Sequence, residues 1–305
     1  MRSYRYLHYD VFTDRPLEGN QLAVFPEPAG LMTEDMQRIA REMNFSESTF
    51  IFPRETPDTD VRMRIFTPGE ELPMAGHPTI GSAFALAMEG VIAQGCERFV
   101  FGLGVGPTPV TLQWTADALD FAWMTQKLPR FEGRLSDRAA LAASLGLDAA
   151  DLVDRAPVEV VSCGLPYLFA PVASRAAVDR VAMNRPAYAA CCKAAGLPER
   201  PLFLFTLDGG APERESIYSR MLAPGVGISE DPATGSASGP LGCYLAVHRL
   251  LAAERLRHFV SLQGVAMQRP SRIHISIGVE GDRITSVRIG GRSVLVGQGT
   301  LHVPD

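Results

Sequence analysis

The chain has 305 residues, a length typical of two domains that are each large enough to bury their own core. Its composition is 46% hydrophobic and 21% charged, with 28 glycines and 23 prolines, which indicates a turn-rich globular protein and excludes a disordered or fibrous one. The net charge of −5 gives no electrostatic reason to expect a nucleic acid or an anionic membrane as partner.

No long apolar run of the kind that spans a membrane occurs, and the first residues lack the apolar region of a secretory signal. We therefore expect a soluble, cytoplasmic protein. The five cysteines are odd in number and form no Cys-x-x-Cys pair, which argues against a disulfide framework and a structural zinc site. We expect these to be small apolar core residues: Cys96, Cys163, Cys191, Cys192 and Cys243.

Strands and helices alternate in the first half. We expect strands at residues 6–12, 21–25, 48–53 and 62–67. Thr33 is a suitable N-cap with acidic residues after it, so a helix is predicted from Thr33 to about Asn44. Small residues from Pro78 to Met88, followed by Gly90, predict a second helix that could run through the middle of a lobe.

A patch with proline and glycine at residues 127–133 is the best linker candidate. It predicts an N-terminal lobe of residues 1–127 and a C-terminal lobe of residues 128–305. In the second lobe we expect a helix from Pro232 to about His248, and strands near residues 273–279, 284–289 and 293–303. The last of these strands could cross back to complete the first lobe.

Two segments of the chain, 154 residues apart, are nearly alike: His77–Ala83 and Asp231–Ala237. The segments before them match in the same order: Arg64–Gly69 with Arg220–Gly225, and more loosely Met43–Phe52 with Ala195–Leu204. A period near 150 indicates a duplicated domain, because solenoid repeats run at roughly 20–50 residues. The duplication predicts two similar lobes around an asymmetric site, with His in one copy and Asp in the other.

Each copy of the motif is predicted to lie at a helix N-terminus, because proline directly after His77 and after Asp231 suits the first helical position. Backbone N–H groups near Gly76, Gly235 and Ser236 would then form an anion site suited to a carboxylate. A simpler alternative makes Asp231 an N-cap and His77 a structural histidine in a turn.

Glu47 falls at the junction between the first predicted helix and the strand that follows it. Apolar neighbours within Phe45–Phe50 would desolvate its carboxyl group and raise its pKa toward the range that a general acid/base needs. The alternative is a solvated loop acid that hydrogen-bonds to nearby backbone.

Other motifs are weaker. Gly102–Gly106 contains part of a dinucleotide fingerprint, but Pro107 and Pro109 follow where a helix should begin, so a tight hairpin or bulge is expected. The sequence contains no Gly-Lys-Ser/Thr phosphate loop, no His-Glu-x-x-His motif and no Gly-x-Ser-x-Gly elbow. We therefore expect any catalysis to use neither a metal ion nor a nucleotide cofactor.

Six segments carry a family resemblance: Arg38–Phe50, Glu71–Pro78, Glu230–Leu241, Leu262–Val265, Arg269–Ser271 and Gly297–Thr300. They resemble the PhzF family of phenazine-biosynthesis proteins, and the likeness covers nearly the whole chain. The resemblance implies an α+β, diaminopimelate epimerase-like fold. In that fold two similar lobes each wrap a curved sheet around a central helix, and the active site lies in the cleft between them.

The resemblance also implies a chemistry. In the family's best-known member, trans-2,3-dihydro-3-hydroxyanthranilate isomerase, the glutamate that matches Glu47 moves a proton between ring carbons without a cofactor. The residues that match the assisting and substrate-holding positions are His77 and Asp231, then Ser236, Gly76 and Gly235. A small cyclic carboxylate substrate and a homodimer are therefore expected.

Two alternatives to this isomerase remain. A non-catalytic protein of the same fold that binds a small molecule or a partner would tolerate Glu47→Gln. An epimerase or racemase of the fold carries a cysteine in each helix-start motif, where this chain has Ala75 and Pro232, and is less favoured. Val161–Tyr167 also departs from the pattern of the best-known isomerase, which leaves the substrate open.

Overall fold

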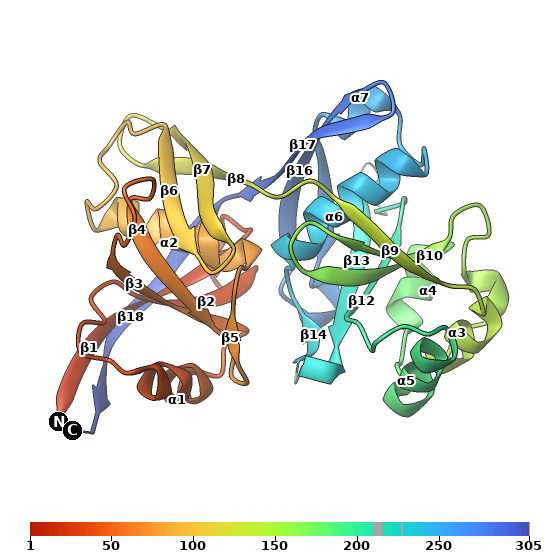
Figure 1. Ribbon diagram of the computed structural model, residues 1–305, viewed down its shortest axis with the longest axis horizontal. Helices are drawn as coiled ribbons and strands as arrows, with labels where there is room; N and C mark the ends of the chain where they lie inside the picture. The colour runs from red at the N-terminus through yellow and green to blue at the C-terminus, as the bar shows by residue number, and fades with distance from the viewer. Residues whose placement is uncertain (210–215, 227, 305) are drawn as a thin grey trace. The chain divides into compact units, whose positions relative to one another are not determined.

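The computed structural model describes residues 1–209, 216–226 and 228–304. The chain divides into two compact units. Unit 1 consists of Met1–Gln126 and Arg288–Asp305, and unit 2 of Lys127–Val287. Strands dominate both units and each contains one buried central helix (Figure 1), which confirms the α+β class. No helix in the described ranges is both long and apolar enough to cross a bilayer.

Unit 1 is built on one curved sheet. Its strands are β1 (Arg2–Val11), β2 (Asn20–Phe25), β3 (Glu47–Pro53), β4 (Val61–Phe66), β5 (Glu71–Leu72), β6 (Arg98–Leu103), β7 (Gly106–Trp114), β8 (Leu119–Thr125), the end of β17 (Arg283–Gly291) and β18 (Ser293–Val303). They pair in the order β18-β1-β2-β3-β4-β6-β7-β8-β17, with β5 also on β4. Only β2–β3 and β4–β6 are parallel pairs in this series.

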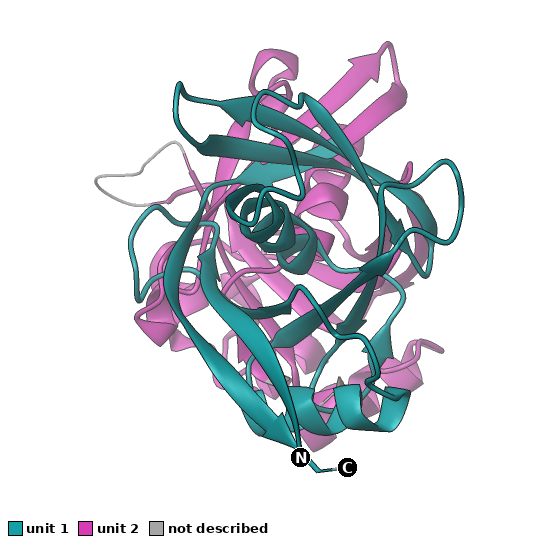
Figure 2. Ribbon diagram, turned by 90° about the vertical axis from the view of Figure 1, so that its left-hand side faces the viewer, with its two compact units in different colours: residues 1–126, 288–305 teal, residues 127–287 magenta. Residues whose placement is uncertain are grey.

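The central helix of unit 1 is α2 (Gly76–Met88), which contacts β1, β2, β3, β8 and β18. Figure 2 shows it almost end-on in teal, with the strands of its unit around it. Every residue from Gly76 to Leu86 is buried, as expected for a helix that is apolar on all sides. A Cβ at Gly81 would lie 2.6 Å from the side chains of Val11 and Leu22, so the close approach of helix and sheet requires glycine there.

Helix α1 (Thr33–Met43) packs on β3 and β4 through Met36, Ile39 and Ala40. It ends at Asn44, whose left-handed backbone (φ 52°) forms the C-cap, as the sequence predicts. The N-terminus differs from the prediction, because Met32 occupies the N-cap place and Thr33 is the first helical residue. The expected hairpin at Gly102–Gly106 is confirmed, since β6 and β7 pair in antiparallel fashion on either side of it.

Unit 2 repeats this plan. Its strands are β9 (Arg130–Leu135), β10 (Val158–Ser162), β11 (Pro166–Pro171), β12 (Leu202–Thr206), β13 (Ile217–Ala223), β14 (Ile228–Asp231), β15 (Phe259–Gln263) and β16 (Ser271–Glu280). They pair in the order β9-β10-β11-β12-β13-β15-β16, with β14 also on β13. The central helix α6 (Gly235–Val247) contacts β10, β11 and β16 and is buried from Gly235 to Leu245.

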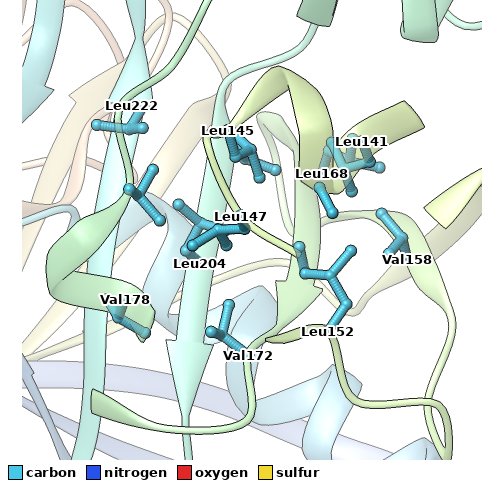
Figure 3. Packing of buried hydrophobic residues seen from close by; sticks show 14 of the residues in the cluster. Leu141, Leu145, Leu147, Leu152, Val158, Leu168, Val172, Val178, Leu204 and Leu222 are labelled. Atoms are coloured by element: carbon cyan, nitrogen blue, oxygen red, sulfur yellow. The ribbon is translucent and has the colours of Figure 1, made fainter. Parts of the chain in front are cut away.

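Short helices add a further layer to unit 2: α3 (Arg138–Ser144), α4 (Arg175–Arg180) and α5 (Arg185–Ala194). They pack on the sheet through an apolar cluster that includes Leu141, Leu145, Val178, Leu204 and Leu222 (Figure 3). The remaining elements are α7 (Ala253–Leu256) and the 3-10 turns η1 (Ala149–Asp151), η2 (Pro224–Val226) and η3 (Val265–Met267). The cluster joins these helices to β11, β12 and β13.

The duplication is confirmed by strand pairing. The parallel pairs β2–β3 and β4–β6 of unit 1 recur in unit 2 as β11–β12 and β13–β15. Each central helix has 13 residues and starts four residues after a short strand, β5 or β14. Two copies of one fold therefore make up the chain.

The alignment of the two copies differs from the one that the sequence motif suggests. The ladder pairs Ile65 with Leu72 in unit 1 and Met221 with Asp231 in unit 2, so Asp231 occupies the place of Leu72. The helices begin at Gly76 and Gly235, 159 residues apart rather than 154. The motifs misalign by five residues because both helix starts are rich in small residues that match by chance.

Neither proline occupies the first helical position, where the sequence predicted it. Pro78 is the third residue of α2, whereas Pro232 precedes α6 and lies outside it. His77 is the second residue of α2, and Asp231 is the last residue of β14 rather than a helix N-cap. Thr234 takes the N-cap place of α6.

Candidate active site

Unit 1 brings Glu47 and His77 together. Glu47 is the first residue of β3 and pairs with Leu22 of the parallel strand β2, and His77 is the second residue of α2. The Glu47 Oε2 atom lies 3.2 Å from His77 Nε2. The Glu47 side chain is 12% exposed and that of His77 is 3% exposed. A carboxyl group and an imidazole are thus held in contact with little access to water.

Asn20 orients the imidazole from its other side. It is buried at the first position of β2, and its amide nitrogen lies 3.1 Å from His77 Nδ1. Burial lowers the pKa of His77 from the ordinary 6.5 to about 3, so the ring is neutral at physiological pH. A neutral ring that accepts the Asn20 N–H at Nδ1 carries its own proton on Nε2. Nε2 is the ring nitrogen that lies 3.2 Å from the Glu47 carboxyl group, without the geometry of a hydrogen bond to it.

Gly76 opens α2 directly beside this pair. Among the described side chains none caps the helix N-terminus, and its first turn contains no acidic residue. The backbone N–H groups of a first helical turn have no partner within the helix and carry the positive end of its dipole. Negative charge near Gly76 and His77 is therefore stabilised by the helix.

Unit 2 holds Asp231 in a hydrogen-bonded loop between β14 and α6. The Thr234 hydroxyl donates to Asp231 Oδ2 at 2.6 Å. Buried Gln263 closes the loop: its amide nitrogen donates to the Asp231 carbonyl at 2.7 Å and to Thr234 Oγ1 at 2.9 Å, and its Oε1 accepts the Thr234 N–H at 3.1 Å. One oxygen of the Asp231 carboxyl group is thus fixed by its own loop.

Ser236 is the second residue of α6, directly after Gly235. Its Oγ lies 2.6 Å from the hydroxyl oxygen of Tyr167, which stands on β11. Both side chains are buried. Unit 2 therefore places a serine–tyrosine pair at the helix position where unit 1 has the histidine.

Sequence reasoning named Glu47, His77, Asp231, Gly76, Gly235 and Ser236 as candidates but did not single out the residues that contact them. Those are Asn20, Tyr167, Thr234 and Gln263. The sequence gives little sign of these residues, because each contacts a residue that is distant in sequence or lies within a short loop. Thr234 and Gln263 do lie within segments that carry the family resemblance.

The cysteines lie outside the helix-start motifs. Cys163, Cys192 and Cys243 are buried, as expected of core residues, whereas Cys96 and Cys191 are half-buried. Within the described ranges no three His, Cys, Asp or Glu side chains gather as possible ligands of a metal ion.

Comparison with known proteins decides the family. The family model of phenazine biosynthesis-like proteins, PhzC-PhzF, matches residues 9–299. The chain belongs to this family. The resemblance found in the sequence is thereby confirmed, and with it the diaminopimelate epimerase-like fold of two similar lobes.

Named relatives of this PhzF-family chain are isomerases. It is 36% identical to the trans-2,3-dihydro-3-hydroxyanthranilate isomerase of Pseudomonas aeruginosa, over 98% of this chain and 100% of the relative. It is 35% identical to an uncharacterized isomerase of Mesorhizobium japonicum, over 99% and 100%. A PhzF-family crystal structure from Bacillus anthracis matches with a TM-score of 0.87 at 28% identity, over 99% and 100%. The chain is an isomerase of this family.

Proposed function

We propose that this protein is a cofactor-independent isomerase that moves a proton within a small cyclic carboxylate, with Glu47 as the general acid/base. The contact between Glu47 and His77 carries the proposal. A carboxyl group that is mostly shielded from water lies 3.2 Å from a neutral, oriented imidazole. Such surroundings favour proton transfer to and from carbon over exchange with solvent.

One carboxyl group is sufficient for the reaction. The Glu47 carboxylate takes a proton from one ring carbon, the electrons of that C–H bond shift the adjacent double bond, and the carboxylic acid returns the proton to another carbon on the same face. Atoms and charge balance, because the product is an isomer of the substrate. In this proposal His77 assists by hydrogen bonding as the proton moves, because its Nε2 atom lies only 3.2 Å from Glu47 Oε2.

The other candidate residues have supporting roles in this proposal. Asp231 assists by hydrogen bonding and sets the protonation state of the substrate. Ser236 and the backbone of Gly76 and Gly235 hold polar groups of the substrate. Support comes from the helix starts, because the first turns of α2 and α6 contain no acidic residue and helix N-termini favour a carboxylate.

The proposed substrate is trans-2,3-dihydro-3-hydroxyanthranilate or a close analogue. The supporting observation is the name of the Pseudomonas aeruginosa relative, which is 36% identical over its entire length. This substrate is a small cyclic carboxylate with a mobile ring proton, as the proposed chemistry of Glu47 requires.

Proton NMR in D2O tests the proposal. We expect the wild type to convert trans-2,3-dihydro-3-hydroxyanthranilate into an isomer with some deuterium uptake. Glu47→Gln should keep the ligand affinity and lose turnover by about 10²–10⁴-fold, the usual contribution of a general acid/base. Glu42→Gln changes an exposed glutamate of α1 and serves as the matched control. Wild-type turnover by Glu47→Gln would remove Glu47 from its role.

A further inference from the structure

We propose that Arg220 and Glu230 are positioning residues that hold Asp231 in place for the reaction. This inference rests on the proposed function. Arg220 lies on β13 and Glu230 on β14, directly before Asp231. The guanidinium makes two parallel hydrogen bonds to the carboxylate, from Nε to Oε1 at 2.9 Å and from Nη2 to Oε2 at 2.8 Å. The side chains are only 11% and 14% exposed.

The same guanidinium is anchored to helix α4. Its Nη1 atom donates to the carbonyl oxygen of Val178 at 3.0 Å and to that of Val181 at 3.2 Å. These carbonyls lie at the C-terminal end of α4, where a cation is also favoured by the helix dipole. Arg220 therefore ties Glu230 to the end of α4, with the planar guanidinium that lysine lacks.

Fixing Glu230 also fixes the direction of Asp231. Successive side chains of a strand point to opposite faces of the sheet. Glu230 bonds Arg220 on the face that carries α4, whereas Asp231 pairs with Met221, the residue after Arg220 on β13. Asp231 therefore points to the opposite face, and Thr234 and Gln263 hold its loop. A rotation of β14 about its axis would break the contacts on both faces together.

The other half of the chain carries a matching pair. Arg64 of β4 makes two hydrogen bonds to Glu71 of β5, at 2.7 and 2.6 Å, in the same ladder register. Glu71 precedes Leu72, which has no polar group, and the pair is more exposed than the one in unit 2. Both halves thus contain the arginine–glutamate pair. The pair in unit 2, which directly precedes Asp231, is the more buried of the two.

A double-mutant cycle tests whether Arg220 acts through Asp231. We expect Arg220→Lys to lower kcat by about 10- to 100-fold with little change in KM, the effect of a misplacement near 1 Å. In an Asp231→Asn background the same change should lower kcat less than about twofold. Equal losses in both backgrounds would overturn the proposal, because a merely structural effect is additive. Arg180→Lys, which changes an exposed arginine of α4, is the matched control.

Hydrogen–deuterium exchange separates this inference from the proposed reaction. If the wild type does not convert the substrate, the proposed function fails while the positioning of Asp231 stays measurable. Arg220→Lys should then raise the exchange of the Asp231 and Thr234 amides at least about tenfold relative to the amides of β12. Unchanged exchange at these two amides would overturn the positioning role.

Discussion

His77 and Ser236 occupy equivalent places in the two halves of the chain, since each is the second residue of a buried 13-residue helix. Their partners differ. His77 contacts Glu47 at the start of β3, whereas the ladder places Pro201 at the corresponding position of unit 2. Ser236 contacts the Tyr167 hydroxyl instead. One scaffold thus carries a carboxyl–imidazole pair in one half and a hydroxyl pair in the other, which supports a single general acid/base.

The buried neutral imidazole predicts a pH-dependent stability. Burial lowers the pKa of His77 to about 3 in the folded chain, whereas the unfolded chain keeps a value near 6.5. Below pH 6.5 the unfolded state therefore binds the extra proton, and the free energy of unfolding falls as the pH drops toward 3, by up to about 1.4 kcal/mol per pH unit.

We expect His77→Gln to flatten this slope in urea unfolding at pH 7, 6 and 5. His302→Gln, at an exposed position of β18, should leave the slope as in the wild type. A wild-type slope in the His77→Gln variant would show that other groups cause the pH dependence.

Gly264 supports the Asp231 loop and cannot be replaced without strain. Its φ is +77°, and a Cβ would lie 2.3 Å from the Arg269 carbonyl and 2.5 Å from that of Pro232. We expect Gly264→Ala to lower the free energy of unfolding by about 3 kcal/mol or more. Gly281 also has a positive φ, +60°, but a Cβ there would have no atom within 4 Å. Gly281→Ala should therefore lower the free energy of unfolding by only about 1 kcal/mol. Equal melting temperatures for the two variants would contradict this account.

Gln263 should matter for both stability and turnover. Gln263→Leu keeps the volume but leaves the Thr234 N–H and the Asp231 carbonyl without their buried partner. The expected loss is about 2–3 kcal/mol in the free energy of unfolding, with a fall in kcat from a displaced Asp231. Gln113→Leu, on the exposed side of β7, should stay within about 0.5 kcal/mol of the wild type. Chemical denaturation and the isomerase assay measure the two effects.

We also predict a homodimer, as the family resemblance implies. Light scattering of the purified protein should give twice the chain mass of 33.0 kDa. A mass near 33.0 kDa at micromolar concentration would contradict this prediction.

Much of the fold is predictable because its elements carry local signals. The helix expected at 78–88 is Gly76–Met88, and the strand expected at 293–303 is Ser293–Val303. Asn44 marks a helix end because a short polar side chain tolerates the left-handed backbone. Periodicity and capping chemistry depend on neighbours along the chain, so single-sequence reasoning has access to them.

The register between the two halves is not predictable in this way. Runs of small residues match equally well when shifted by five, and only the ladder between β13 and β14 places Asp231 beside Met221. The partners of the site residues pose the same problem. Asn20 lies 57 positions from His77, and Gln263 lies 32 positions from Asp231, so their contacts depend on strand pairing across the fold.

The central claim is that the carboxyl group of Glu47 carries one proton between two carbons of the substrate. The most direct test uses trans-2,3-dihydro-3-hydroxyanthranilate that bears deuterium at the carbon that loses its proton, with NMR of the product formed in H2O. Our account predicts wild-type product with part of the label at the receiving carbon, and product from Glu47→Gln at a rate about 10²–10⁴-fold lower. Release of all the label into water, together with an active Glu47→Gln variant, would contradict it.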